Sequence, residues 1–171
     1  MTLRKLTCIV LAFAAVTAAG AARSQVDSED WKEAEVPSPP ALNVSRLLPF
    51  EVSPNSSLTF AVDQDSVVVS REDGVTRYVM VASSRTGGRN VLYEGIRCET
   101  AEVKTYARYT TEGKWVPVRE PAWKSLFDNM PSKHALRLAK VGVCDGKAPA
   151  TSAQEVVRQL RAGPDFGNAA D

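Results

Sequence analysis

The fold is decided by two neighbouring runs, Val75-Thr-Arg-Tyr-Val-Met-Val-Ala-Ser83 and Arg89-Asn-Val-Leu-Tyr-Glu-Gly-Ile-Arg-Cys98, which are separated by the turn Thr86-Gly-Gly88. A third run, Ala101-Glu-Val-Lys-Thr-Tyr-Ala-Arg-Tyr109, follows closely. In all three runs β-branched and aromatic residues alternate with polar ones, and glycine or charged turns separate them. This pattern is typical of an antiparallel β-meander.

Three more strands are expected around this meander. Two precede it, at residues 57–62 and 66–70, with a turn over Asp63–Asp65 between them, and a short edge strand follows at Trp115–Val118. The Asp73-Gly74 pair marks a hairpin turn just before the meander. Because short loops join all six strands, we expect them to pair antiparallel in one sheet.

The pattern changes after Val118. Trp123, Leu126 and Phe127 have helical spacing behind Pro121, and residues 132–138 fit either a short helix or a loop. Residues 139–144 indicate a last strand. A capping box at Ser152–Glu155 opens a C-terminal helix, which Gly163 ends. We therefore predict an α+β fold with one antiparallel sheet of six or seven strands, one or two short helices and a C-terminal helix.

The first 24 residues resemble a secretory signal peptide, with the basic head Arg4-Lys5, an apolar run and small residues before a cleavage point. A membrane anchor is the alternative, but the run is short and an acidic segment follows it. Cys8 precedes the apolar run, so we expect no lipidation and a mature chain that starts near Gln25. No later run is apolar enough to span a bilayer. We expect export to the periplasm, or a peripheral position at the outer membrane.

The remaining chain divides by composition into three parts. An acidic and proline-rich extended arm is expected over residues 25–48, the folded α+β domain over 49–164, and a loose tail over 165–171. Removing residues 1–24 leaves 18 basic residues (21 − 3) against 20 acidic ones. This near-neutral balance gives no reason to expect a nucleic-acid partner.

Two cysteines, Cys98 and Cys144, remain after signal cleavage. In an oxidising compartment such a pair is most simply a disulfide, which here closes a loop of 46 residues (144 − 98). A redox-active pair is the alternative, but the spacing lacks the CxxC pattern of that chemistry.

Residues with known catalytic or metal-binding patterns are scarce. His134 is the single histidine, so a histidine-based metal site is excluded, and the short acidic turns lack the spacing of a calcium loop. The chain has no Gly-x-Ser-x-Gly elbow and no glycine-rich phosphate loop before a helix. We therefore assign no catalytic residue, no metal and no cofactor, although a catalytic triad assembled in space stays open.

One face of the predicted sheet is a candidate contact surface. By strand alternation Tyr93 shares a side with Arg97, and Tyr106 shares a side with Arg108. If the two pairs lie on one exposed face, tyrosines interleave with cations there. Such a surface suits an envelope partner, whether protein, glycan or lipid headgroup. An ordinary solvated sheet face is the alternative.

Several segments resemble the CNP-one-like family (cryptic neisserial protein one). The segments are Asp73–Tyr78, Asn90–Cys98 and Lys104–Ala107, followed in order by Trp115, Trp123, His134 and Cys144. The resemblance covers most of the mature chain. It implies an exported protein of Gram-negative bacteria, and it brings no catalytic residues. Some members are described as lipoproteins, a label that the missing lipobox does not support here.

These observations favour a non-catalytic binding or accessory domain of the cell envelope. A small periplasmic hydrolase with a site around His134 is one alternative, and it predicts a deep pocket that holds His134 beside Ser, Asp or Glu. A structural subunit of an envelope assembly is another, and it predicts an exposed apolar patch.

Overall fold

The computed structural model describes residues 31–163. Contacts divide the chain into one unit, Met1–Trp31, and a second, Lys32–Asp171, and the second is described from here on. The predicted signal peptide, the predicted tail and the arm residues before Trp31 lie outside the described residues. No helix in the described part is long and apolar enough to cross a membrane.

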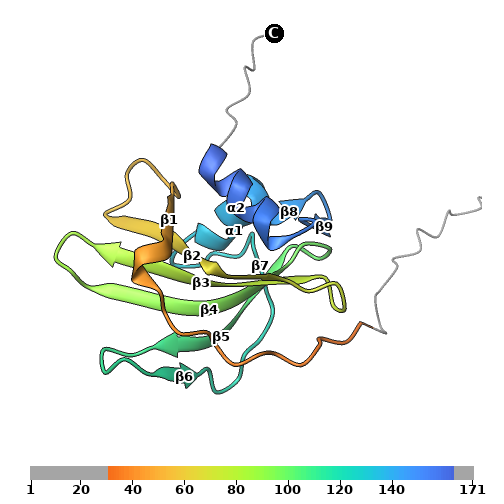
Figure 1. Cartoon of the computed structure of the whole chain (residues 1–171), viewed down its shortest axis with the longest axis horizontal. Coiled ribbons are helices and arrows are strands. Elements are labelled where there is room, and N and C mark those ends of the chain that lie inside the picture. The colour runs from red at the N-terminus through yellow and green to blue at the C-terminus, as the bar shows by residue number, and fades with distance from the viewer. Residues whose placement is uncertain (1–30, 164–171) are drawn as a thin grey trace, which may run out of the picture. The chain divides into compact units, whose positions relative to one another are not determined.

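The second unit is built on one antiparallel sheet whose strands follow chain order (Figure 1). A seventh strand, β7 (Lys124–Ser125), pairs with β5 beside β6. The predicted meander and α+β class are confirmed. The six main strands are β1 (Leu47–Phe50), β2 (Leu58–Val69), β3 (Val75–Ser84), β4 (Arg89–Arg97), β5 (Glu102–Tyr109) and β6 (Trp115–Pro117).

The hairpin between β2 and β3 closes as its sequence predicts. Gly74 has φ +69°, a conformation that side-chain-bearing residues rarely adopt, and the N–H of Ser70 donates to the Val75 carbonyl at 3.0 Å. The expected turn at residues 63–65 does not exist, because β2 runs straight through it. The pairing register of β2 with β3 shifts between Asp63 and Val68, and this shift accommodates the additional residues of β2. The Ser66 hydroxyl completes the ladder there by accepting the N–H of Val79 at 2.8 Å.

The segment after the sheet differs from its prediction in two places. Residues 121–127 form no helix but supply β7, because backbone pairing with β5 is available to them. The expected strand at 139–144 is instead a π-helical turn, Ala139–Val143, that continues the short helix α1 (His134–Leu138). Only Cys144–Asp145 (β8) is extended, and it pairs with β9 (Ala148–Pro149).

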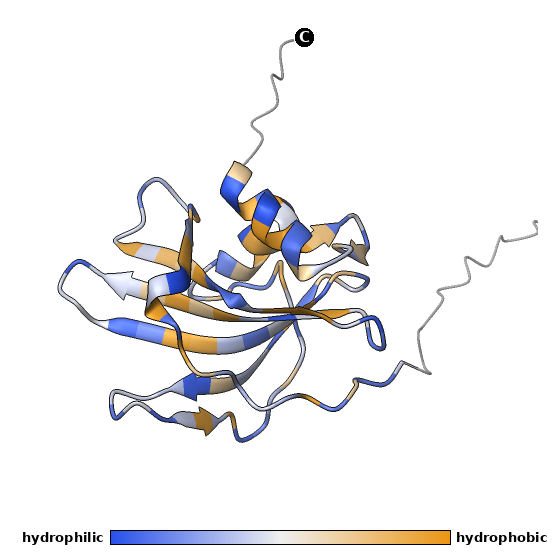
Figure 2. Cartoon of the chain, in the orientation of Figure 1, coloured by the Kyte–Doolittle hydropathy of each residue, from blue (hydrophilic) through white to orange (hydrophobic). Residues whose placement is uncertain are grey.

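The C-terminal helix α2 (Ala153–Ala162) begins where the capping box predicts. The Ser152 hydroxyl accepts the N–H of Glu155 at 3.2 Å, which satisfies one of the free donors of the first turn. Val156 and Leu160 are buried, and the polar residues between them face outward (Figure 2). Helix α2 packs on β1 and β2.

Both faces of the sheet are covered, so we name them by what covers them. The helix face packs against α1 and α2. The arm face packs against residues 32–43, which run without regular structure along the side of the sheet opposite the helices (Figure 1). Because β3 is buried on both faces, residues 75–82 are all buried. The buried apolar cluster on the arm face consists of Val79, Val81, Val91, Tyr93, Tyr106 and Ala107.

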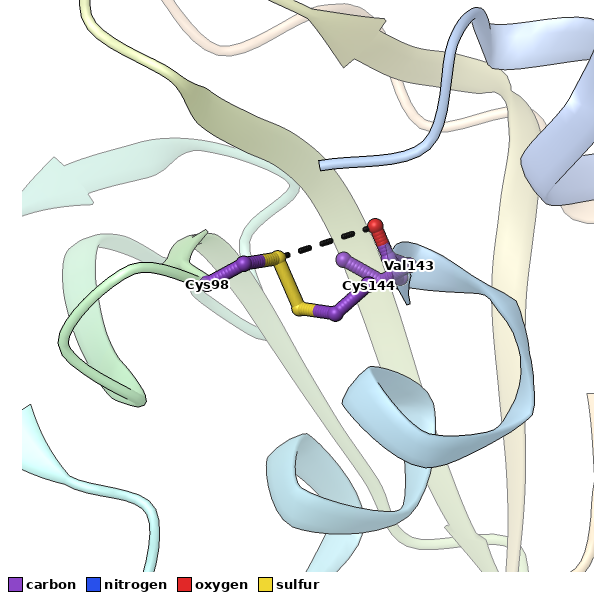
Figure 3. Close-up of a disulfide and its surroundings, with 3 residues drawn as sticks. All are labelled: Cys98, Val143 and Cys144. Carbon is purple, nitrogen blue, oxygen red and sulfur yellow. Dashed lines mark hydrogen bonds between the residues drawn. A yellow bond between two sulfur atoms is a disulfide. The ribbon is translucent and has the colours of Figure 1, made fainter. Parts of the chain in front are cut away.

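A disulfide fastens the helical segment to the sheet (Figure 3). Cys98, just past the end of β4, is bonded to Cys144 with a Cα–Cα distance of 5.6 Å, inside the usual range for disulfides. The dashed line in Figure 3 marks the approach of the Cys98 Sγ to the Val143 carbonyl oxygen, 3.7 Å.

Candidate functional site

A buried carboxylate lies at the centre of the helix face. Strand alternation on β4 directs Glu94 to the same side as Leu92 and Ile96, and only 2% of Glu94 is exposed. A carboxylate in such surroundings is costly unless donors surround it. The neighbouring residues therefore have to supply hydrogen bonds.

Three residues supply them. The Thr105 hydroxyl donates to Oε1 of Glu94 at 3.1 Å, and the Tyr78 hydroxyl donates to Oε2 at 3.3 Å. The Nε2 of His134 lies 2.8 Å from Oε2. Burial, together with the Glu94 carboxylate, raises the pKa of Tyr78 well above its ordinary value, so this phenol stays a donor. The network ties β3, β4 and β5 to the first residue of α1.

His134 links this network to a serine. Its ring lies 6.0 Å from the Phe60 ring and nearly parallel to it, and its Nδ1 lies 3.1 Å from the Ser132 hydroxyl. A neutral ring with hydrogen on Nε2 fits both contacts, since Nε2 then donates to Glu94 and Nδ1 accepts from Ser132. The Ser132 oxygen also accepts the backbone N–H of His134 at 3.2 Å.

Four residues of this network, Glu94, Thr105, Ser132 and His134, line a cavity of about 360 Å³ between the sheet and the start of α1. The volume is in the range of small-molecule sites. Exposed Arg108 and Lys124 and the carboxylate of Glu120 also line the cavity. Its walls are mainly apolar: Leu58, Phe60, Met80, Leu92, Val103 and Met130.

The arrangement can hold an apolar group of modest size, with the cations Arg108 and Lys124 in its lining. Glu94 is already satisfied by three donors, so it has little left to offer a ligand. Neither cation, Arg108 or Lys124, forms an ion pair within residues 31–163, so both can meet a negative group. Among residues 31–163, no group of three or more His, Cys, Asp or Glu side chains is placed to hold a metal ion.

The four residues of the predicted contact surface do not share an exposed face. Arg108 pairs with Leu92 and lies on the helix face, at the cavity. Tyr93, Arg97 and Tyr106 lie on the opposite side and are buried, with 3%, 6% and 8% of each exposed. The prediction of one exposed Tyr/Arg surface is therefore wrong as a matter of geometry.

A β-bulge explains why Tyr106 and Arg108 separate. Tyr93 pairs with Ala107, and the next residue, Glu94, pairs with Thr105, so Tyr106 is an extra residue in β5. The bulge breaks the strict alternation on which the prediction rested.

Arg97, the fourth predicted surface residue, is paired with the carboxylate of Glu99 at 2.9 Å.

The sequence does contain a signal for the cavity that the prediction overlooked. Glu94 stands between Leu92 and Ile96, two apolar residues of the same parity, so an acidic residue was placed on a buried face. A buried acid needs a partner, and His134 offers one. Glu94 and His134 are 40 residues apart, so no local pattern in the sequence indicates that they pair.

The family model of the CNP1-like family matches residues 26–161. No curated protein matches the chain, and neither does any solved structure.

Proposed function

We propose a function for this chain, which belongs to the CNP1-like family. In this proposal it is an exported, non-catalytic accessory protein of the cell envelope that binds a small amphiphile. The cavity on the helix face carries this proposal. Its apolar walls take the body of the ligand, and Arg108 and Lys124 meet a negatively charged head. Arg108 thus keeps a binding role, on a different surface from the one that the sequence indicated.

Direct titration with decanoate tests the binding site. We expect decanoate to bind and decyltrimethylammonium, which has the same chain and the opposite charge, not to bind. Arg108→Gln should weaken decanoate binding about tenfold, because a hydrogen bond to a charged group contributes about 1.5 kcal/mol. The proposal is contradicted if the two probes bind equally well or if neither of them binds.

A pocket-filling variant locates the ligand. Ala122 lines the cavity and is exposed, so Ala122→Trp should occupy the space and abolish decanoate binding without disturbing the core. The matched control is Ala162→Trp, a change of the same size at an exposed position on α2. If both variants lose binding equally, the ligand is not in this cavity.

Export is tested by mass spectrometry of the protein from its own host. The position of Cys8 ahead of the apolar run supports a mature N-terminus near Gln25 without an acyl group. A diacylglyceryl mass on an N-terminal cysteine contradicts this, and an intact N-terminus contradicts export.

A hydrolase is the second candidate, because the Ser132 hydroxyl, the His134 ring and the Glu94 carboxylate form a continuous hydrogen-bonded chain at the cavity. This order of hydroxyl, imidazole and carboxylate is that of a serine nucleophile with its base. A fluorophosphonate probe decides between the candidates. If the probe labels the native protein and the Ser132→Ala variant is not labelled, the hydrolase is favoured. The non-catalytic proposal predicts no labelling and no hydrolysis of p-nitrophenyl decanoate.

A further inference from the structure

Residues 32–43 of the arm are held on the arm face at several points rather than simply lying across it. The N–H of Ala34 donates to the Asp73 carboxylate at 3.0 Å, and the N–H of Asn43 donates to the Asp63 carboxylate at 2.9 Å. Between these two points the indole N–H of Trp115 donates to the Pro40 carbonyl at 2.9 Å. Side chains of the sheet and of the β2–β3 hairpin therefore bind the backbone of this extended segment.

One carboxylate of the arm has a dedicated site. Glu33 accepts from the Tyr106 hydroxyl and from the Lys104 ammonium, both at 2.6 Å, and lies 3.6 Å from the Arg77 guanidinium. Arg77 is 2% exposed and is also paired with Asp73 at 2.6 Å. Part-buried, charge-assisted contacts of this kind select a carboxylate over a neutral or positive group.

The proline-rich part of the arm faces a row of aromatic rings. The Trp115 ring lies 6.3 Å from that of Tyr93 and 5.0 Å from that of Tyr109, and Tyr93 lies 5.5 Å from Tyr106. A cavity of about 390 Å³ remains between the arm and these rings, so the arm does not fill its groove. The arm residues that line this cavity are Val36, Pro37, Ser38 and Pro39.

We propose that the arm face is a recognition groove for an extended, proline-rich segment that carries a carboxylate ahead of its prolines, and that such a segment of a partner protein replaces the arm. Aromatic grooves with an indole donor recognise such segments because a proline-rich chain is already extended and loses little entropy on binding. The arm then acts as an intramolecular competitor. The proposal uses the face opposite the amphiphile cavity and does not depend on it.

A competitor on the same chain is hard to displace, since a short tether gives it an effective concentration of about 1 mM or more. The test therefore weakens the arm in the full-length protein. Glu33→Lys places a cation against Lys104 and Arg77, whereas the matched control Glu35→Lys makes the same charge change at an exposed arm position. The probe is a fluorescent peptide with the sequence of residues 32–42.

We expect the Glu33→Lys protein to bind this peptide at least about tenfold more tightly than the native or Glu35→Lys protein does, because the tethered competitor is weakened. A peptide with alanine in place of its three prolines should bind much more weakly. Equal affinity of the two variants, or equal binding of the two peptides, overturns the proposal. A dimer of the native protein by light scattering also overturns it, since the groove then belongs to the arm of a second copy.

The native protein provides a test that does not require the variant to fold. Titration with the peptide at millimolar concentration should shift the NMR signal of the Trp115 indole N–H, which exchanges its Pro40 partner for one in the peptide. An unchanged indole signal up to 10 mM peptide, about ten times an effective tether concentration of about 1 mM, overturns the proposal.

Discussion

A Cβ atom on Gly95 would lie 2.6 Å from the Tyr106 hydroxyl and 2.8 Å from Cγ1 of Val75. Glycine here lets the Tyr106 ring cross β4 and place its hydroxyl on Glu33. We predict that Gly95→Ala lowers the free energy of unfolding by about 1–3 kcal/mol, the usual cost of overpacking.

Urea denaturation measures this change. The matched control is Gly88→Ala, where the added Cβ meets only the flexible Ser84 hydroxyl at 3.2 Å, and we expect a change within about 0.5 kcal/mol. Equal losses in the two variants contradict the close approach of Tyr106 to β4.

The Asp73 carboxylate makes stability depend on pH. Burial alone raises its pKa, but hydrogen bonds from Arg77, Ser70 and two backbone N–H groups outweigh burial and lower the pKa from 3.8 to about 2. Because the pKa of Asp73 is lower in the folded state, the ionised carboxylate stabilises the fold by about 2 kcal/mol at any pH above the unfolded-state pKa. This contribution is lost as pH falls from about 4 to 2.

We predict that Asp73→Asn lowers stability at pH 7 by about 2 kcal/mol or more and flattens the decline between pH 4 and pH 2. Urea denaturation across pH 2–7 measures both effects. Glu72→Gln, at the exposed neighbouring position, should keep the native pH profile. A steep acid decline that persists in Asp73→Asn assigns the effect to other groups.

At the scale of elements, the disulfide joins the end of β4 to the segment that follows the π-helical turn, at Cys144. We predict that replacing both cysteines with alanine lowers the free energy of unfolding by about 2–5 kcal/mol, the usual cost of losing a native disulfide. Chemical denaturation under non-reducing conditions gives the value. Two titratable thiols in the freshly isolated native protein contradict the bond.

The elements were predictable where local chemistry decides them. The Asp73-Gly74 turn and the Ser152 cap each depend on a few adjacent residues, and both formed as expected. The errors lie where tertiary pairing overrode a local pattern. The polar stretch Asp63-Gln-Asp65 favoured a turn, but β2 continues through it and pairs with β3 on both sides. The bulge at Tyr106 depends on the neighbouring strand, so β5 alone gave no sign of it.

At the scale of the whole molecule, the sites depend on residues that the chain order keeps apart. Forty positions separate Glu94 from His134, and 73 separate Glu33 from Tyr106. Strand parity predicted which side of β4 each residue faces, but not that the arm would cover the tyrosines. Of the predicted site residues, the disulfide pair is joined in the structure, and Arg108 alone lies at the cavity.

The tyrosines provide a test of both covered faces at once. Burial raises the pKa of Tyr78 on the helix face, and it raises the pKa of Tyr93 and Tyr106 on the arm face. Because the folded state holds these protons more tightly, the corresponding stability is complete below pH 10 and is lost above it. We predict that these three of the four tyrosines ionise only as the protein unfolds.

Absorbance at 295 nm during an alkaline titration measures the ionised fraction, and circular dichroism follows unfolding. In the arm variant Glu33→Lys, Tyr106 should ionise at a lower pH than in the native protein, while the ionisation of Tyr78 is unchanged. Reversible ionisation of all four tyrosines near pH 10 in the folded protein contradicts the burial of both faces.

The order of the strands bears on how the chain reaches this state. From β1 to β6, each strand pairs with the one made just before it. Contacts between near neighbours in sequence have a small loop-closure cost and favour fast folding. The sheet can therefore assemble progressively as the chain is synthesised, hairpin by hairpin, without waiting for distant partners. The docking of α2 on β1 and β2 comes late, because α2 follows all the strands in the chain.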